Sequence, residues 1–334
     1  MWSRVFSFLG VVALASTTLQ SSLALAQETF TVRDSWTVSG LQAGWFWAED
    51  KGYFAKAGIK VVHEDGNGST TTIQLVGSGQ FDVGYGDLSV MAIARGKGVP
   101  LKSIGGLIQK TSLGVFVPQN SGLKTPKDLE GKEVIYTSTS FEAPFIDAFL
   151  AAGGTTRDKL NLVSVDASAK IPTYASGRGD GMITSIPFGV PFLKKRPSDY
   201  ILFGDYGLAI PSYGLLVRED TLSKRRDGLA KLSAAFYKAW TDIVDGGDAT
   251  VAEAADIIIK RRPDAKLDRT VVIDTIVEHI KYFRTSNTAS KPLGLQTPED
   301  WARTIASLES AKLIPTGSKP ADYFTNDLFV EPSK

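Results

Sequence analysis

The 334-residue sequence contains no cysteine and only two histidines. It can therefore form no disulfide, offers no thiol nucleophile and has no cysteine that a lipid anchor could modify. Two histidines without a thiol do not supply the usual parts of a zinc site or of a Ser-His-Asp triad. A G-x-S-x-G turn and a phosphate-binding glycine loop are also missing. We therefore expect no catalytic residues, no metal and no cofactor.

The sequence also lacks a surplus of either charge, since 37 Lys and Arg residues stand against 36 Asp and Glu residues. Nucleic-acid-binding proteins need a concentrated basic face, so we expect no nucleic acid partner. With 43% hydrophobic and 22% charged residues, the composition is that of a globular chain long enough for two packed lobes.

Long hydrophobic runs are missing after residue 26, where no stretch approaches the roughly 20 apolar residues of a membrane-spanning helix. The first 26 residues instead have the pattern of an export signal. Arg4 provides the positive charge, residues 5–15 form a short apolar run, and the small-residue triplet 24–26 precedes Gln27. We predict cleavage after Ala26 and a free periplasmic protein, with an uncleaved anchor as the alternative.

From residue 29 on, strand-like and helix-like segments alternate. Strands are expected at 29–34, 60–64, 81–84 and 103–108, and helices at 43–57, 69–77 and 88–95. Such alternation predicts a mostly parallel sheet with helices on both faces.

A second α/β block is expected after the apolar segment 113–117, where residues 118–122 are typical of a turn. The chain should return near Pro211, and amphipathic helices should follow at 229–244, 251–261, 269–282 and 298–309. We therefore assign residues 27–118 and 211–334 to a discontinuous lobe 1 and residues 119–210 to lobe 2. Two crossings between rigid lobes are what a hinge needs.

Four segments carry a resemblance to a known family: GYFAKAG at 52–58, GNGS at 66–69, residues 75–84, and PKDLEGK at 126–132. In this order and spacing, the chain resembles the substrate-binding proteins of bacterial ABC importers for nitrate, sulfonates, taurine and thiamine precursors. The resemblance implies an α/β fold of the type II periplasmic-binding class, with two lobes, two hinge crossings and a small-molecule ligand in the cleft. It also implies a membrane permease as partner and a monomeric protein.

Ligands of such sheets collect at the carboxyl ends of the strands. The residues expected to bind the ligand are Trp36, Trp45, Asn67, Ser69, Thr70, Tyr85, Asp87, Ser138, Thr139, Ser140, Phe141, Glu142 and Ser185.

Acidic residues outnumber basic ones near these strand ends, and no arginine fork for an anion is evident. We therefore favour a neutral or amine-bearing planar ligand, such as a pyrimidine precursor of thiamine, whose N–H groups Glu142 or Asp87 accept. A sulfonate, taurine or nitrate is the alternative ligand. Helix capping is the alternative role for both acids.

Two other classes of function remain open. The resemblance extends to fungal pyrimidine synthases, which consume an active-site histidine and carry a cysteine cluster. The present sequence has no cysteine, and we expect His63 and His279 to be structural. A ligand-sensing protein that reports to a membrane receptor is the third reading.

Overall fold

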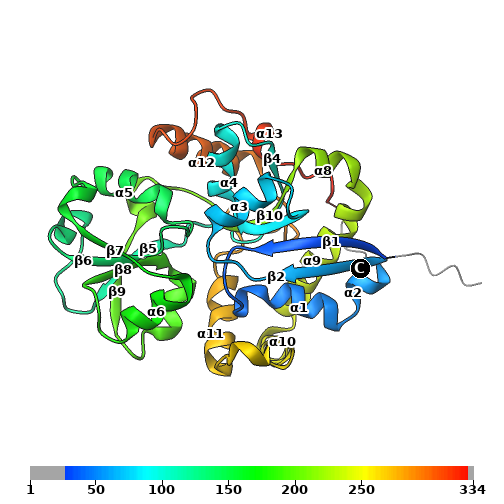
Figure 1. Ribbon diagram of the computed structural model, residues 1–334, viewed down its shortest axis with the longest axis horizontal. Helices are drawn as coiled ribbons and strands as arrows, with labels where there is room; N and C mark the ends of the chain where they lie inside the picture. The colour runs from blue at the N-terminus through cyan, green and yellow to red at the C-terminus, as the bar shows by residue number, and fades with distance from the viewer. Residues whose placement is uncertain (1–26, 330–334) are drawn as a thin grey trace, which may run out of the picture.

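The computed structural model describes residues 27–329, so the predicted signal peptide at 1–26 lies outside the described residues. Within the described part of the chain, no helix is both long and apolar enough to cross a membrane. The described residues form two lobes that lie side by side, and the first and last described segments belong to the same lobe (Figure 1).

Each lobe is built on a five-stranded sheet. Sheet A has the order β2 (Ile59–Glu64), β1 (Glu28–Asp34), β3 (Val83–Asp87), β10 (Tyr213–Arg218) and β4 (Leu101–Gly106). Sheet B has the order β7 (Asn161–Ser164), β6 (Glu133–Tyr136), β8 (Gly181–Ser185), β5 (Leu113–Pro118) and β9 (Ser198–Leu202). We call the halves around these sheets lobe A and lobe B. The predicted two-lobed α/β fold is confirmed.

Both sheets are mixed because each contains one reversed strand. Strand β10 runs antiparallel to β3 and β4, and β5 runs antiparallel to β8 and β9. Each reversed strand is the one that the chain enters directly after crossing between the sheets.

The first crossing lies earlier than the sequence suggested. Strand β5 pairs with β8 and β9, so the chain leaves sheet A through residues 107–112 rather than after Pro118. The boundary at residue 118 was therefore wrong by the length of one strand. An apolar strand has the same local pattern in either sheet, because its pairing partners are distant in sequence. The return crossing runs through residues 207–212, which include Pro211.

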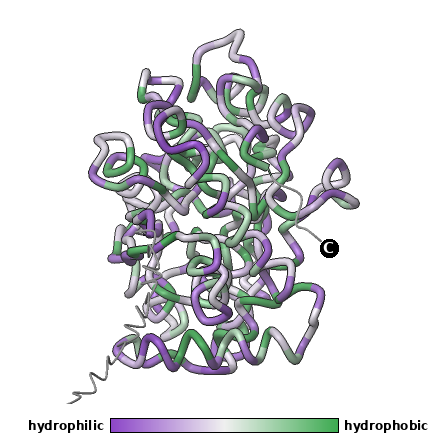
Figure 2. Tube along the Cα trace, turned by 90° about the vertical axis from the view of Figure 1, so that its right-hand side faces the viewer, coloured by the Kyte–Doolittle hydropathy of each residue, from purple (hydrophilic) through white to green (hydrophobic). Residues whose placement is uncertain are grey.

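Helices cover both faces of sheet A. One face packs against α1 (Ala43–Asp50), α9 (Arg226–Asp245), α10 (Gly247–Arg261) and α11 (Arg269–Ile280). The other face packs against α3 (Ser69–Gly77), α4 (Leu88–Gly96) and α12 (Pro298–Ser310), with the short α13 (Pro320–Tyr323) beside them. The short helices α2 (Tyr53–Lys56) and α8 (Glu219–Lys224) complete this lobe. In Figure 2, hydrophilic stretches lie mainly at the periphery of the trace.

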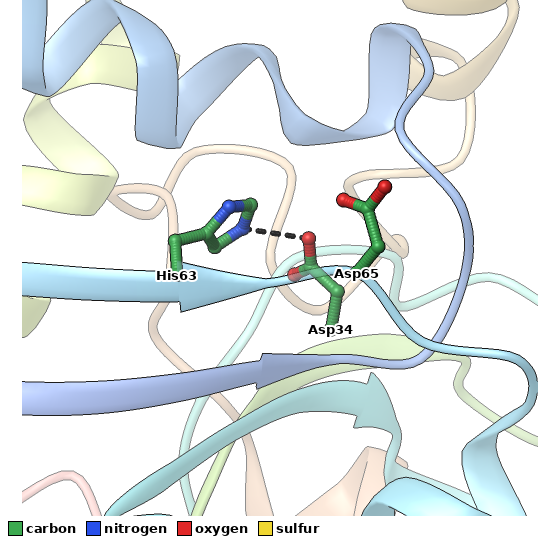
Figure 3. A group of neighbouring side chains, drawn as sticks. All are labelled: Asp34, His63 and Asp65. Atoms are coloured by element: carbon green, nitrogen blue, oxygen red, sulfur yellow. Dashed lines mark ion pairs between the residues drawn. The ribbon is translucent and has the colours of Figure 1, made fainter. Parts of the chain in front are cut away.

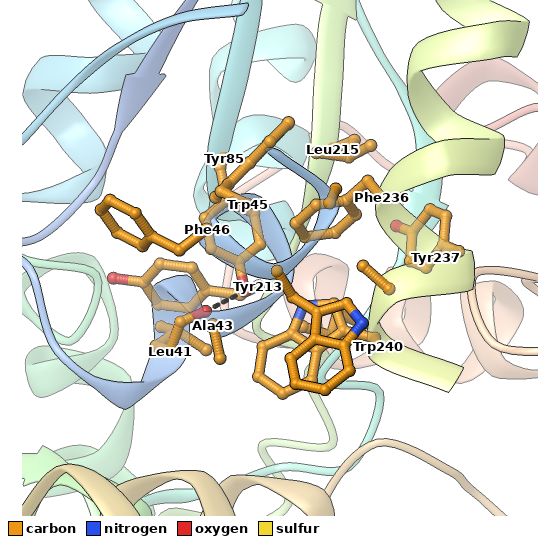
Figure 4. Packing of buried hydrophobic residues seen from close by; sticks show 14 of the residues in the cluster. Leu41, Ala43, Trp45, Phe46, Tyr85, Tyr213, Leu215, Phe236, Tyr237 and Trp240 are labelled. Atoms are coloured by element: carbon orange, nitrogen blue, oxygen red, sulfur yellow. Dashed lines mark hydrogen bonds between the residues drawn. The ribbon is translucent and has the colours of Figure 1, made fainter. Parts of the chain in front are cut away.

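The longest helix, α9, shows why these segments are helical. Its buried residues Leu229, Leu232, Phe236, Trp240 and Ile243 recur every three or four positions, which places them on one face. This face packs on α1 in an aromatic core (Figure 4).

Two local features departed from the sequence-based prediction. The expected helix at 43–57 is divided into α1 and α2, because Gly52 has a φ of 70°, which an α-helix does not allow. In lobe B, α6 (Ala167–Ala175) was not predicted, and it contains Pro172.

Lobe B also contains α5 (Ile146–Ala152) and α7 (Ile186–Gly189), the latter followed by the 3₁₀ turn η5 (Val190–Phe192). Helix α11 of lobe A packs against both α7 and η5. The two lobes therefore touch each other in addition to sharing the crossing segments.

Candidate functional site

The lobes meet at the loops that follow β2 and β6. The Thr139 hydroxyl donates to the Asn67 carbonyl at 2.6 Å, and the Thr70 N–H donates to the Thr139 carbonyl at 3.1 Å. Between these two bonds lies Gly68, whose φ is 139° and whose Cβ, if it had one, would lie 2.2 Å from the Thr139 oxygen. Glycine is therefore required at position 68 for the lobes to approach this closely.

A groove of about 720 Å³ opens beside this contact. Lobe A contributes Thr37 and Asn67, and lobe B contributes residues 137–139, residues 164–169, Thr173 and Arg178. The groove thus has residues from both lobes, and Asn67, Ser138 and Thr139 of the predicted site lie on it.

Trp36 is held between the lobes. It lies two residues after β1 and is 8% exposed. Its ring centroid is 6.3 Å from that of Phe188 and 4.9 Å from the Lys170 ammonium, both of which belong to lobe B. Trp36 therefore lies at the lobe interface and contacts lobe B, but it is not among the residues that line the groove.

A buried ion pair lies next to Trp36. The Lys170 ammonium, on α6, is 2.5 Å from Glu142 Oε1, and the two side chains are 1% and 0% exposed. Glu142 precedes the 3₁₀ turn at Ala143–Phe145 but does not cap it with its side chain. Its second oxygen, Oε2, is buried and has no hydrogen-bond partner within residues 27–329. A buried carboxylate oxygen in this state is an open acceptor.

Asp87 is the last residue of β3 and is fully buried. Its Oδ1 accepts from the N–H groups of Ser89 at 3.0 Å and Val90 at 2.9 Å, so it caps α4. The capping alternative is thus confirmed for Asp87. Burial raises the pKa of Asp87 to about 7 and the nearby charge of Glu142 adds to this rise, although the capping hydrogen bonds oppose it.

Tyr213, the first residue of β10, is buried, and its ring centroid lies 5.4 Å from that of Tyr85. Burial raises its pKa well above the ordinary value, and the charges of Asp87, Asp34 and Glu142 contribute to the rise. The phenol therefore stays neutral and remains a hydrogen-bond donor.

The predicted hydroxyl residues are present but mostly engaged. The Ser69 hydroxyl accepts from the Asp87 N–H at 3.2 Å, and the Ser140 hydroxyl donates to the Thr137 carbonyl at 2.8 Å. Ser185 lies 3.0 Å from the Ser112 hydroxyl across β8 and β5. These three serines are buried, and their hydroxyl groups are engaged within the protein.

Three predicted aromatic residues lie in hydrophobic cores and not on the groove. Trp45 packs 4.3 Å from Phe236, and Tyr85, which is fully buried, donates its hydroxyl to the Leu41 carbonyl at 3.1 Å (Figure 4). Phe141 is 5% exposed and packs in the core of lobe B. The pleat of β3 turns Tyr85 toward the layer of α1 and α9, which explains its place.

The sequence-based list omitted Lys170, Phe188 and Tyr213. Phe188 comes shortly after the carboxyl end of β8, so the rule that ligands collect at such ends could have found it. Tyr213 lies at the amino end of β10, which that rule does not cover. Lys170 lies in the segment ASAKIPTYA, where nothing in the local pattern marks a buried lysine.

His279 lies in α11 and is fully buried. Its Nδ1 donates to the Thr275 carbonyl at 2.6 Å, and burial lowers its pKa to about 4. It is therefore a neutral core residue, as the sequence suggested.

The amino-acid sequence matches a known protein family. The family model described as NMT1/THI5 like matches residues 41–249, more than half of the chain. The formylaminopyrimidine-binding protein of Halalkalibacterium halodurans is 25% identical over 291 residues, which cover 85% of this chain and 86% of the relative. The 4-amino-5-hydroxymethyl-2-methylpyrimidine phosphate synthase of Aspergillus parasiticus is 27% identical over 157 residues, covering 47% and 45% of the two chains.

A solved structure supports the fold. The alkanesulfonate-binding protein SsuA of Xanthomonas axonopodis pv. citri matches with a TM-score of 0.66 and 15% identity, over 89% of this chain and 98% of that structure. The two-lobed architecture is therefore that of the type II periplasmic binding proteins, and the chain belongs to the NMT1/THI5-like family.

Proposed function

We propose that this protein is the ligand-capturing component of an ABC importer and works in the periplasm. Its support is the two-lobed fold, the groove with residues from both lobes, and relatives whose names describe binding proteins. In this proposal the ligand enters between the lobes, and its contacts with both of them stabilise the closed form. A membrane permease then recognises that closed form.

The proposed ligand is a neutral, planar, nitrogen-containing solute of the pyrimidine class. The single observation that carries this choice is Glu142, whose Oε2 is buried without a partner in the described part of the chain. An N–H group of a ligand satisfies such an oxygen, whereas a sulfonate or nitrate oxygen is repelled by it. Lys170 already balances the charge of Glu142, so the ligand needs no charge of its own.

Trp36 supports the same choice. Its ring lies at the lobe interface, and flat heterocycles stack favourably on indole rings. An anionic ligand is the alternative, and Arg178 on the groove is the residue that favours it. Asp166 lines the same groove, and its carboxylate disfavours an anion there.

Calorimetric titration of a 4-aminopyrimidine and of an alkanesulfonate against the same protein tests the proposal. We expect the aminopyrimidine to bind and Glu142→Gln to weaken it by at least about tenfold, or about 1.4 kcal/mol. The control is Glu130→Gln, which removes a glutamate of the same lobe paired with Lys159 at the surface. Sulfonate binding that Glu142→Gln improves, without aminopyrimidine binding, contradicts the pyrimidine proposal.

We also propose that the protein is not an enzyme, although the family includes synthases. After incubation with the bound solute, mass spectrometry should recover both the ligand and the protein unchanged. A mass loss on either His63 or His279 would show chemistry instead of capture.

A further inference from the structure

A second polar cluster lies apart from the groove, at the carboxyl ends of β1 and β2. Asp34 is the last residue of β1, His63 lies in β2, and Asp65 follows β2 directly. One donor atom of each lies within 4.8 Å of the other two. Figure 3 shows the three side chains gathered on the face of the sheet under the neighbouring helix.

The carboxylate of Asp34 is poorly satisfied. The side chain is 0% exposed, and its Oδ1 has no hydrogen-bond partner among residues 27–329. Its Oδ2 lies 2.6 Å from His63 Nε2. Thr72 bonds to the backbone carbonyl of Asp34 and leaves the carboxylate alone. A buried carboxylate oxygen without a hydrogen-bond partner is costly, so a further partner for it is expected.

Two residues of the cluster, His63 and Asp65, line a groove that opens to solvent, and Asp34 is buried next to His63. A groove of about 550 Å³ is lined by His63, Asp65, Arg262 and the aromatic residues Trp45, Phe46 and Phe54. The rings of Trp45 and Phe46 lie 5.8 Å and 5.7 Å from the imidazole ring, which fixes its orientation. A small hydrated ion can therefore approach a preformed arrangement of donor atoms.

We propose that Asp34, His63 and Asp65 bind a divalent metal ion of the zinc class. One imidazole nitrogen and two carboxylate oxygens form a donor set that zinc accepts, with water from the groove completing the coordination. Mg²⁺ and Ca²⁺ prefer sites made wholly of oxygen and are disfavoured by the imidazole. The composition alone had suggested no metal, because it counted histidines without showing that two acids surround one of them.

Arg262 is the competitor of the ion. Its guanidinium bonds to both oxygens of Asp65, at 2.8 Å and 2.9 Å, and also to Asp264. It neutralises Asp65 when no ion is present. Metal binding must therefore share or displace Arg262, and removing the arginine should strengthen binding.

A short segment of the chain connects the proposed metal site with the lobe interface. Asp34 is two residues before Trp36, whose carbonyl accepts from the Gly66 N–H at 3.1 Å. An ion held by Asp34 and Asp65 ties together the two segments that flank this bond. It would thus fix the segment that places Trp36 between the lobes.

Calorimetric titration of Zn²⁺ into chelator-treated full-length protein tests the proposal, with Mg²⁺ titrated in parallel. We expect one zinc ion per chain and no saturable binding of magnesium. His63→Ala and Asp65→Asn should each weaken zinc binding by at least about tenfold, and Arg262→Gln should strengthen it. Asp256→Asn, which removes the carboxylate of a surface pair with Arg269, is the control and should bind as the wild type does.

Cobalt provides a second readout, because the visible absorption of bound Co²⁺ reports nitrogen and oxygen ligands and should disappear in His63→Ala. Circular dichroism confirms that each variant is folded, and Asp65→Asn, at a partly exposed position, is retained if His63→Ala unfolds. No saturable zinc binding, or equal affinity in wild type and the folded ligand variants, overturns the proposal.

Discussion

Removing either partner of the buried ion pair between Lys170 and Glu142 should strongly lower the free energy of unfolding. Its atoms are 2.5 Å apart and its side chains are at most 1% exposed, so solvent screens the pair very little. Removing one partner leaves the other charge buried and unpaired, which costs roughly 3 to 5 kcal/mol. Lys170→Met also loses the contact with the Trp36 ring, worth about 1 kcal/mol.

The assay is a double-mutant cycle of Lys170→Met and Glu142→Gln, with urea unfolding followed by fluorescence and by circular dichroism without ligand. Coincident curves from the two probes confirm a single transition. We expect each single variant to lose about 3 kcal/mol or more, and the double variant to lose much less than the sum.

The matched control is the surface pair of Arg157 and Asp147, whose side chains are 41% and 71% exposed. A cycle of Arg157→Met and Asp147→Asn should give a coupling energy below about 1 kcal/mol. A coupling energy for Lys170 and Glu142 as small as that of the control would refute the reasoning, because it would mean that water reaches the pair.

Burial raises the pKa of Asp87 from 3.8 to about 7, so the folded protein retains a proton that the unfolded chain releases. The free energy of unfolding should therefore decrease as the pH rises from about 4 to about 7, by roughly 4 kcal/mol at most. The Asp87→Asn variant can still cap α4, and urea titrations of it should show a weaker dependence on pH. Gly68→Ala should hinder closure of the lobes and weaken ligand binding by at least about tenfold in calorimetry. Gly58 also has a positive φ, but the space around its Cβ position is open, so Gly58→Ala should lower stability without changing ligand affinity. Mass spectrometry of the exported protein should find Gln27 at the N-terminus, and an intact Met1 would contradict the predicted signal.

The sequence predicted most of what depends on local pattern. The strands β1 and β2 and the helix-capping role considered for Asp87 follow from periodicity and end signals. The meeting of loops at the strand ends follows from the α/β alternation. These features need only residues close to one another in the chain.

Features that depend on distant parts of the chain were missed. The lobe of β5 is set by its pairing with β8 and β9, and the burial of Lys170 is set by Trp36 of the other lobe. Tyr85 has the same local pattern whether its ring faces the core or a groove. Such questions are decided by packing, which periodicity does not contain.

The most direct test of the central claim is a crystal structure of the protein with an aminopyrimidine bound. We predict that the pyrimidine ring lies between the lobes and against Trp36, with one of its N–H groups at hydrogen-bond distance from Glu142 Oε2. A ligand held by one lobe alone, or one seated in the groove beside His63, would contradict it.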